Sequence, residues 1–226
     1  MKQYCMIRMD LMNSRTIKNR SEIQECLYDF LNDLNKEYES ILVAPIAIVL
    51  GDEWSILLRD GHYAYEIYLK IKRFLKDYEL EVYTGIAYGT IKSEESDIRL
   101  IEGEALDLAA YNLRIAKSSK FGYQKQIPTK ACHILVSGLH STFYGVDCNE
   151  LVNDLIQNNE ILLSKVTKTQ QAMIQLYEKY GSYNQILKHH IDITKRMISD
   201  GLNKSEYWLI CENVRQIEAL LAMNYS

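Results

Sequence analysis

Two apolar runs that flank a short polar break are the most regular hydrophobic pattern in the chain. Residues 41–50 are apolar and rich in β-branched side chains, and the pattern resumes after Gly51, Asp52 and Glu53. Glycine tolerates a positive φ and the two acids favour solvent, so the pattern predicts two strands joined by a tight turn. The length of the first run predicts a strand buried on both faces in the middle of a sheet, with a local irregularity at Pro45.

The apolar spacing on either side of this hairpin predicts helices and further strands. A helix is expected from Ser21, a suitable N-cap, and a second helix over residues 62–78. Strands are expected over residues 4–12 and 80–89. The resulting order, βαββαβ, is that of a ferredoxin-like fold in the α/β (α+β) class. Right-handed crossovers then place both helices on one face of a four-stranded antiparallel sheet.

This strand order brings acidic residues together. Asp10 ends the first predicted strand, and Asp52 and Glu53 lie at the turn that opens the third. The first and third strands are neighbours in a ferredoxin-like sheet, so the three acids are expected at one sheet end. Carboxylate oxygens suit Mg²⁺, which makes Asp10, Asp52 and Glu53 the candidate metal ligands. The alternative is a polar hairpin tip that needs only solvent.

The rest of the chain divides into a continuation of this domain and a helical tail. A charged loop at residues 90–100 is followed by a predicted helix over 103–117, a polar loop over 118–129, a strand over 132–137, and a short helix over 146–157 with a linker after it. Four tail helices are predicted, over residues 169–180, 183–190, 195–202 and 205–223. The expected domains are therefore residues 1–160 and 161–226.

The second and third tail helices have the spacing of a helix-turn-helix motif. The side chains expected to pack between them are Leu187, Ile191, Ile193, Met197, Ile198 and Leu202. The residues expected on the exposed face of the third helix, and therefore as candidate DNA contacts, are Lys195, Arg196, Ser199, Asn203 and Lys204. Lys188 and Asp192 replace the small residue and the glycine that are usual in this motif, so a helical module that binds another protein is the alternative.

Charge weakens the case for DNA binding by a single module. The net charge is −4, and from Glu160 onward eight Lys and Arg oppose seven Asp and Glu. A tail without a strong basic surface is expected to bind DNA only as a homodimer. The last helix carries an apolar stripe that is either the dimer surface or a packing surface within its own domain: Ile210, Val214, Ile217 and Leu221.

Cysteine spacing and hydropathy restrict the cellular setting. The five cysteines are odd in number and contain no Cys-x-x-Cys pair, which favours reduced thiols over disulfides or a zinc site. The N-terminus does not have the pattern of a signal peptide, and no apolar run approaches the roughly 18 residues of a membrane span. We therefore expect a soluble, cytoplasmic protein without a membrane partner.

Several short motifs resemble known proteins. Leu50-Gly-Asp-Glu-Trp54, Gly85-Ile-Ala-Tyr-Gly89 and Gly103-Glu-Ala105 resemble the turn, strand and helix start of the diguanylate and class III nucleotidyl cyclase palm. Together with Asp10-Leu-Met-Asn-Ser-Arg15, with Arg20 and Gln24 and with the helix-turn-helix spacing, they make most of the chain resemble the SatD family of small bacterial proteins.

The resemblance implies a nucleotide ligand bound with Mg²⁺. The ligand-binding residues that it implies are Asn13, Ser14, Arg15, Gly51, Gly85, Gly89 and Arg114. Tyr111 stands where class III cyclases place a catalytic arginine, and Arg114, one turn further on, is the candidate substitute. Loss of such an arginine costs several orders of magnitude in related phosphoryl transfer, so binding is favoured over catalysis.

Three functions follow as expectations. The first is a bacterial regulatory protein whose α/β domain binds a metal–nucleotide ligand and whose tail contacts DNA. The enzyme alternative is an active Mg-dependent nucleotidyltransferase or cyclase. The third is a non-catalytic, dimerising protein-interaction module.

Overall fold

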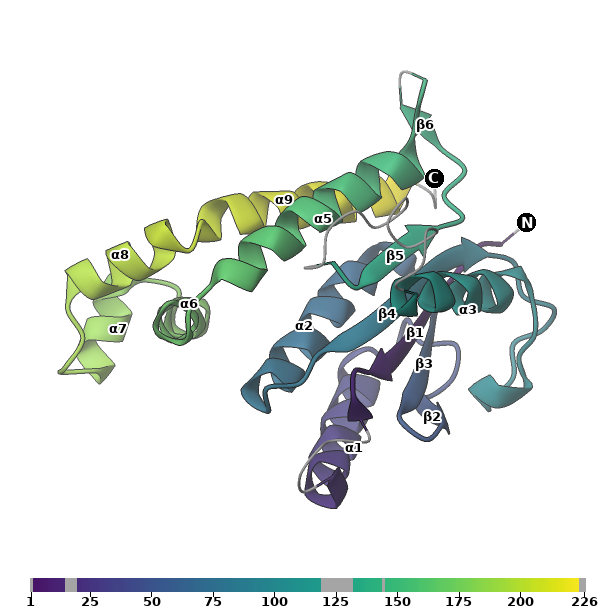
Figure 1. Ribbon diagram of the computed structural model, residues 1–226, viewed down its shortest axis with the longest axis horizontal. Coiled ribbons are helices and arrows are strands. Elements are labelled where there is room, and N and C mark those ends of the chain that lie inside the picture. The colour runs from purple at the N-terminus through teal and green to yellow at the C-terminus, as the bar shows by residue number, and fades with distance from the viewer. Residues whose placement is uncertain (1, 15–19, 119–131, 144, 224–226) are drawn as a thin grey trace.

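A five-stranded sheet with helices on both faces forms the centre of the protein (Figure 1). The computed structural model describes residues 2–14, 20–118, 132–143 and 145–223. The strands are β1 Tyr4–Leu11, β2 Ala47–Leu50, β3 Glu53–Leu58, β4 Val82–Gly89 and β5 Ile134–Ser137, in the order β2-β3-β1-β4-β5. β1 is antiparallel to β3 and β4, and β5 is parallel to β4. The chain is therefore a mixed α/β protein, as predicted, and the sheet is mixed rather than purely antiparallel.

The first hairpin strand is an edge strand, which corrects the expectation of a central one. β2 begins only at Ala47 and pairs with β3 alone. Before it, Leu42 makes an isolated bridge to Leu58, and Arg59 N–H donates to the Ile41 carbonyl at 2.7 Å. The apolar run is thus partly a buried irregular segment, which periodicity alone cannot distinguish from a buried strand. The central strands, which pair with a neighbour on each side, are β3, β1 and β4, and β3 is the neighbour of β2.

The turn between β2 and β3 is as predicted. Gly51 has φ +62, and a Cβ built there would meet no atom within 4 Å. Conformation rather than space therefore favours glycine at this position. The same turn presents Asp52 and begins β3 at Glu53.

One face of the sheet is covered by helices from both ends of the chain. They are α1 Arg20–Glu37, α2 Ala64–Asp77 (which follows the 3-10 helix η2 Gly61–Tyr63), α5 Cys148–Lys165 and α9 Tyr207–Ala222. Their side chains join one core with Ile7 and Met9 of β1. Because α1 begins at Arg20, Ser21 lies inside its first turn and the prediction of Ser21 as N-cap is wrong.

The other face is covered by α3 Glu104–Lys117, which follows the 3-10 helix η3 Ile98–Leu100. A Cβ on Gly85 would lie 2.3 Å from the Ala109 carbonyl oxygen, and one on Gly89 would lie 2.9 Å from the Ala105 nitrogen. Gly85 and Gly89 thus leave room for the α3 backbone, which approaches this strand closely. The structure gives both glycines a packing role, and their ligand contacts stay a prediction.

The helical tail has its own small core. It contains α6 Lys168–Tyr180, α7 Tyr183–His189 and α8 Lys195–Lys204, and the N-caps Ser182 and Thr194 each accept a backbone N–H at a helix start. Buried members of this core are Met173, Ile174, Ile186, Ile198 and Leu202.

Two helices connect the tail to the sheet. The linker predicted after residue 157 is wrong, because α5 continues to Lys165 and passes through the expected boundary at 160–161. α9 returns alongside α5 to the sheet, whereas α7 and α8 lie at the far end (Figure 1). The short hairpin of β6 Thr142–Phe143 and β7 Val146–Asp147 precedes α5.

Several smaller expectations can be compared directly. No disulfide joins any of the five cysteines, all of which lie in the described part of the chain. None of the helices in the described part of the chain combines the length and apolar character of a membrane span. The polar loop predicted over residues 118–129 lies outside the described residues, apart from Ser118.

Candidate functional site: a carboxylate cluster at the sheet end

Asp10 and Glu53 face each other across neighbouring strands. They are register partners in the β1–β3 pair, at the end of β1 and the start of β3. Lys117, the last residue of α3, places its Nζ 3.1 Å from Asp10 Oδ2 and 3.7 Å from Glu53 Oε2. Arg8 Nη1 lies 3.5 Å from the other oxygen of Glu53. These four residues are called the carboxylate cluster below.

The strand alternation explains why α3 supplies the cation. Ile7 and Met9 point into the core beneath α1 and α2, so Arg8 and Asp10 project from the opposite face, on which α3 lies. α3 ends beside β1, which brings Lys117 to the two carboxylates. The cluster is therefore assembled from three elements that are far apart in the sequence.

Burial raises the pKa of Asp10, although Lys117 opposes this by hydrogen bonding and by charge. The negative charge of Asp52 raises the pKa further, so Asp52 lies near enough to act on Asp10. A partly buried carboxylate with a second acid beside it is favoured in its ionised form by any cation that enters the site. The carboxylates at this sheet end therefore favour the binding of a cation.

The donors fit a metal that is bound together with phosphate. Among the described residues, no three His, Cys, Asp or Glu side chains are grouped closely enough to hold a metal ion by themselves. Magnesium at nucleotide sites commonly uses one or two carboxylates and takes its other ligands from phosphates and water. Asp10 and Glu53 would be those carboxylates, with Asp52 adding negative charge.

Three of the other candidate ligand residues lie near the acids in the sequence. Gly51 lies beside Asp52, and Asn13 and Ser14 lie two and three residues after the end of β1, so these three are close in sequence to the acids. Asn13 has a positive φ of 51, which is uncommon for a residue with a side chain. Arg15 lies outside the described residues.

Arg114 does not join the carboxylate cluster. Its side chain is exposed, and its guanidinium carbon lies 5.3 Å from the centre of the Tyr111 ring. The cation that α3 brings to the cluster is Lys117, one turn further along the helix, and sequence reasoning missed it. The available signal was the basic residue at the end of the helix that follows the glycine-containing strand.

In the tail, the predicted DNA-contacting side chains lie on the outer side of α8. Lys195, Arg196, Asn203 and Lys204 are exposed and Ser199 is partly exposed. Asp200 lies among them, with its Oδ2 3.3 Å from Lys204 Nζ and 4.0 Å from Arg196 Nε. The surface is basic but partly neutralised by this acid.

The segment predicted to be a helix-turn-helix packs differently from the prediction at two of its positions. Ile191 is 96% exposed and Met197 is 44% exposed, so neither is a core residue. Ile186 is the fully buried residue of α7. The close helix crossing is made by Gly201, where a Cβ would lie 2.7 Å from the Met173 side chain, and not at the exposed Lys188.

The apolar stripe of α9 packs within the chain. Ile217 and Leu221 are buried in the core beneath the sheet, Val214 packs against that core, and Ile210 belongs to the tail core. The stripe is therefore covered within the chain and does not form the free surface that the dimer prediction needs. The alternative, packing within its own domain, holds only for Ile210, because α9 packs on α5, α2 and η2 as well as on the tail.

The fold and the cluster define an α/β protein with an acidic site at one sheet end and a helical C-terminal region. The family model of the SatD family matches residues 4–206. The chain therefore belongs to the SatD family, as its motifs indicated. No curated protein matches the sequence.

Proposed function

We propose that this protein is a cytoplasmic regulator whose carboxylate cluster binds a nucleotide together with Mg²⁺ and whose α8 contacts DNA. The observation that carries the proposal is the pairing of Asp10 and Glu53 on adjacent strands around one shared ammonium group. The strand order β2-β3-β1-β4 with two helices on one face supports a ferredoxin-like, cyclase-like palm, in which such a sheet end is a nucleotide site.

The chemistry of the cluster suits a metal–phosphate ligand. A magnesium ion neutralises charge on phosphate oxygens, and here Asp10 and Glu53 would hold it. With the carboxylates neutralised by the metal, the Lys117 ammonium becomes available to pair with a phosphate oxygen. Lysine serves this role in many nucleotide sites as a mobile point charge.

Binding is favoured over turnover. Phosphoryl-transfer enzymes place a cation where charge develops on the reacting phosphate, and Arg114 instead lies over Tyr111. The enzyme alternative, a Mg-dependent nucleotidyltransferase, predicts consumption of nucleoside triphosphates in the presence of Mg²⁺ or Mn²⁺. The regulatory proposal predicts binding without consumption.

A protein partner for the tail is the second candidate. It is favoured by the exposure of Ile191 and Met197 next to the basic residues of α8, because exposed apolar side chains are typical of protein contacts. DNA binding is favoured by the exposed Lys195, Arg196 and Lys204.

The nucleotide site is tested by calorimetric titration of nucleoside triphosphates with and without Mg²⁺. We expect Asp10→Asn to remove the Mg²⁺-dependent part of the affinity, and Lys117→Gln to weaken binding by roughly tenfold or more, the value of a charged hydrogen bond. Asp33→Asn is the matched control, because Asp33 is an exposed acid of α1 whose carboxylate pairs with Lys36 at 2.9 Å. Unchanged Mg²⁺-dependent binding in Asp10→Asn would contradict the proposal.

A further inference from the structure

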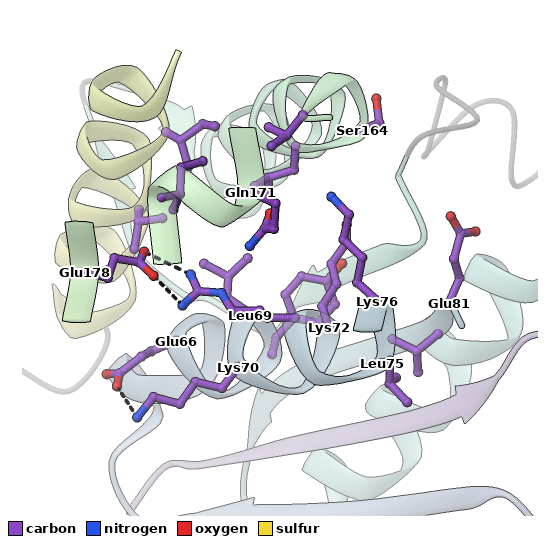
Figure 2. Close-up of a pocket in the computed structure, with 18 of the residues that line it drawn as sticks. Glu66, Leu69, Lys70, Lys72, Leu75, Lys76, Glu81, Ser164, Gln171 and Glu178 are labelled. Atoms are coloured by element: carbon purple, nitrogen blue, oxygen red, sulfur yellow. Dashed lines mark hydrogen bonds and ion pairs between the residues drawn. The ribbon is translucent and has the colours of Figure 1, made fainter. Parts of the chain in front are cut away.

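A cavity of about 750 Å³ lies between the sheet domain and the helical tail. Its floor is α2, and its other walls come from the junction of α5 with α6, from α9 and from the start of β4 (Figure 2). Small-molecule pockets in proteins commonly measure 300–1,000 Å³. The cavity lies on the α2 side of the sheet, whereas the carboxylate cluster lies on the α3 side, so the two are separate.

Most of the cavity wall is apolar. Its apolar side chains come from four helices, from the α5–α6 linker and from the start of β4, and include Leu69, Leu75, Leu80, Val82, Val166, Ile174, Ile210 and Val214. A surface of this kind favours the hydrocarbon part of a ligand, at about 25 cal/mol for each Å² removed from water.

Two of the three acids of the lining have cationic partners. Glu66 pairs with Lys70 at 3.1 Å, and Glu178 pairs with Arg73 through two contacts of 2.7 and 3.1 Å. Glu81 lies 3.7 Å from His133. Burial lowers the pKa of His133, so this histidine is not a cationic partner, and Glu81 remains an exposed acid at the β4 side of the cavity.

Lys76 is the lysine of the lining that forms no ion pair among the described residues. Lys72, one turn before it on α2, is bound to the buried carboxylate of Glu160, whereas Lys76 has no ion-pair partner among the described residues. Partial burial and the nearby charge of Lys72 both lower the pKa of Lys76. In Figure 2, Lys76 rises from α2 into the cavity, towards the wall from which Gln171 points back.

We propose that this cavity binds a small amphipathic organic anion, with its single acidic group between Lys76 and Gln171 and its hydrocarbon body against the apolar wall. The acid would pair with the ammonium group and accept a hydrogen bond from the Gln171 amide. The apolar body would lie against Val166, Ile174 and Val214, which come from the tail side of the cavity. Such a ligand contacts α2, α6 and α9 together and therefore stabilises the contact between sheet domain and tail.

The test uses an anionic fluorescent probe and two matched competitors. Anilinonaphthalene sulfonate, an amphipathic anion that fluoresces in apolar sites, is titrated onto the full chain and then displaced with decanoate or with decanol. We expect saturable binding that decanoate displaces at a concentration at least about tenfold lower than decanol, since a charged contact contributes about one order of magnitude in affinity. Decanoate is also expected to raise the melting temperature in proportion to its occupancy.

Two variants locate the site. Lys76→Gln should weaken decanoate about tenfold while leaving decanol unchanged, because it removes the charge and little of the apolar wall. Val214→Trp should weaken both competitors by filling the cavity, and its circular dichroism and melting curve show whether the fold is kept. Lys188→Gln is the matched control, because Lys188 is an exposed lysine of α7 outside the cavity.

Three outcomes would overturn the proposal: no saturable probe binding, equal displacement by decanol and decanoate, or unchanged decanoate affinity in Lys76→Gln. Asp10→Asn separates this site from the nucleotide site, since it should leave decanoate binding unchanged. Failure of one proposal therefore leaves the other standing.

Discussion

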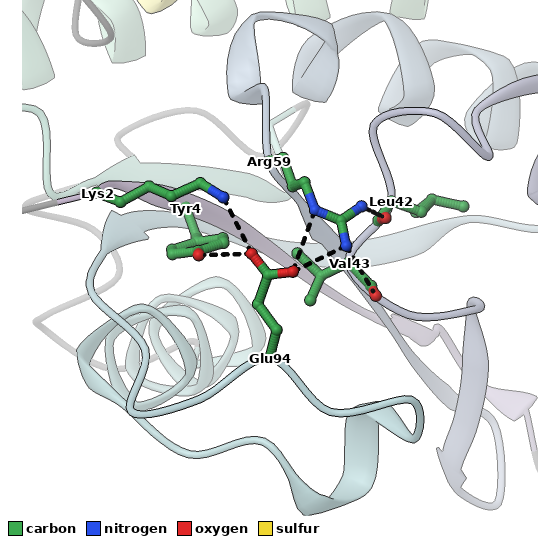
Figure 3. A network of polar contacts seen from close by, with 6 residues as sticks. All are labelled: Lys2, Tyr4, Leu42, Val43, Arg59 and Glu94. Atoms are coloured by element: carbon green, nitrogen blue, oxygen red, sulfur yellow. Dashed lines mark hydrogen bonds and ion pairs between the residues drawn. The ribbon is translucent and has the colours of Figure 1, made fainter.

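Glu94 shows how one side chain can fix a loop across a sheet. Its Oε1 accepts hydrogen bonds from Tyr4 Oη at 2.7 Å and Lys2 Nζ at 3.0 Å, and its Oε2 accepts one from Arg59 Nη2 at 2.9 Å (Figure 3). Arg59 also donates to the carbonyls of Leu42 and Val43. One carboxylate therefore connects the 90–100 loop, β1 and the irregular segment before β2.

These contacts predict a pH dependence of stability. Hydrogen bonds from Arg59 first, then from Tyr4 and Lys2, hold the pKa of Glu94 at about 2, below the ordinary value for glutamate. A depressed carboxylate pKa adds stability above the unfolded value and loses it as pH falls towards the folded value. We expect the melting temperature of the wild type to fall between about pH 5 and pH 3 more steeply than that of Glu94→Gln.

The control for this prediction is Glu95→Gln, on the same loop, where the carboxylate accepts from Ser93 at 2.8 Å. Melting curves followed by circular dichroism at several pH values provide the measurement. Parallel pH profiles for wild type and Glu94→Gln would show that the contacts in Figure 3 contribute little in solution.

At the scale of elements, the contact between β4 and α3 is close enough for a single substitution to probe it. Gly85 lies under the helix with its built Cβ 2.3 Å from a backbone oxygen and 2.4 Å from the Leu113 nitrogen. Backbone atoms cannot rotate away as a side chain can, so a methyl group here must separate strand and helix. This contact also sets the position of Lys117, at the end of the same helix.

Gly85→Ala is therefore expected to lower the free energy of unfolding by about 2–3 kcal/mol, the upper part of the range for overpacking. Gly181→Ala is the comparison, because Gly181 has φ +70 and its Cβ would meet nothing within 4 Å. Its cost should be about 1 kcal/mol, from the left-handed conformation alone. Urea denaturation measures both, and an equal cost for the two variants would argue against tight β4–α3 packing.

At the scale of the whole molecule, the tail is held against the sheet domain by shared helices and by ion pairs. α5 and α9 both enter the core beneath the sheet. Arg73 of α2 pairs with Glu178 of α6, and Lys168 at the start of α6 lies 2.7 Å from Glu79. Rearrangement at the cavity between these elements would therefore move α8 relative to the sheet.

The DNA-contacting proposal predicts a salt-dependent interaction. Binding to duplex DNA, measured by fluorescence anisotropy at several salt concentrations, should weaken as salt rises. Lys195→Ala/Arg196→Ala should reduce the slope of log affinity against log salt by about 2, because each phosphate contact contributes about 0.9. If DNA is read by two copies, affinity should also rise steeply with protein concentration.

Lys92→Ala is the control, since Lys92 pairs with Glu102 on the sheet domain, away from α8. Absence of binding at low salt, or an unchanged slope in the double variant, would favour a protein partner. In that case Ile191→Ser should reduce capture of the partner, because Ile191 is almost fully exposed in the turn before α8.

The sequence by itself determined the local conformations of this protein. Helical spacing marked α2, α3 and the tail helices, and Gly51, Ser182 and Thr194 marked a turn and two helix starts. These features depend on φ preferences and on hydrogen bonds between residues a few positions apart, which the chain specifies directly. The family membership could also be inferred from short motifs.

Only the tertiary structure decided which surfaces meet. It placed β2 at the sheet edge, α3 against Gly85 and Gly89, and the α9 stripe in the core beneath the sheet. Apolar periodicity shows that a face is buried but not which element covers it, because long-range packing selects the partner. For the same reason, the ammonium of Lys117 beside Asp10 and the cavity around Lys76 follow from the fold and could not be predicted from spacing.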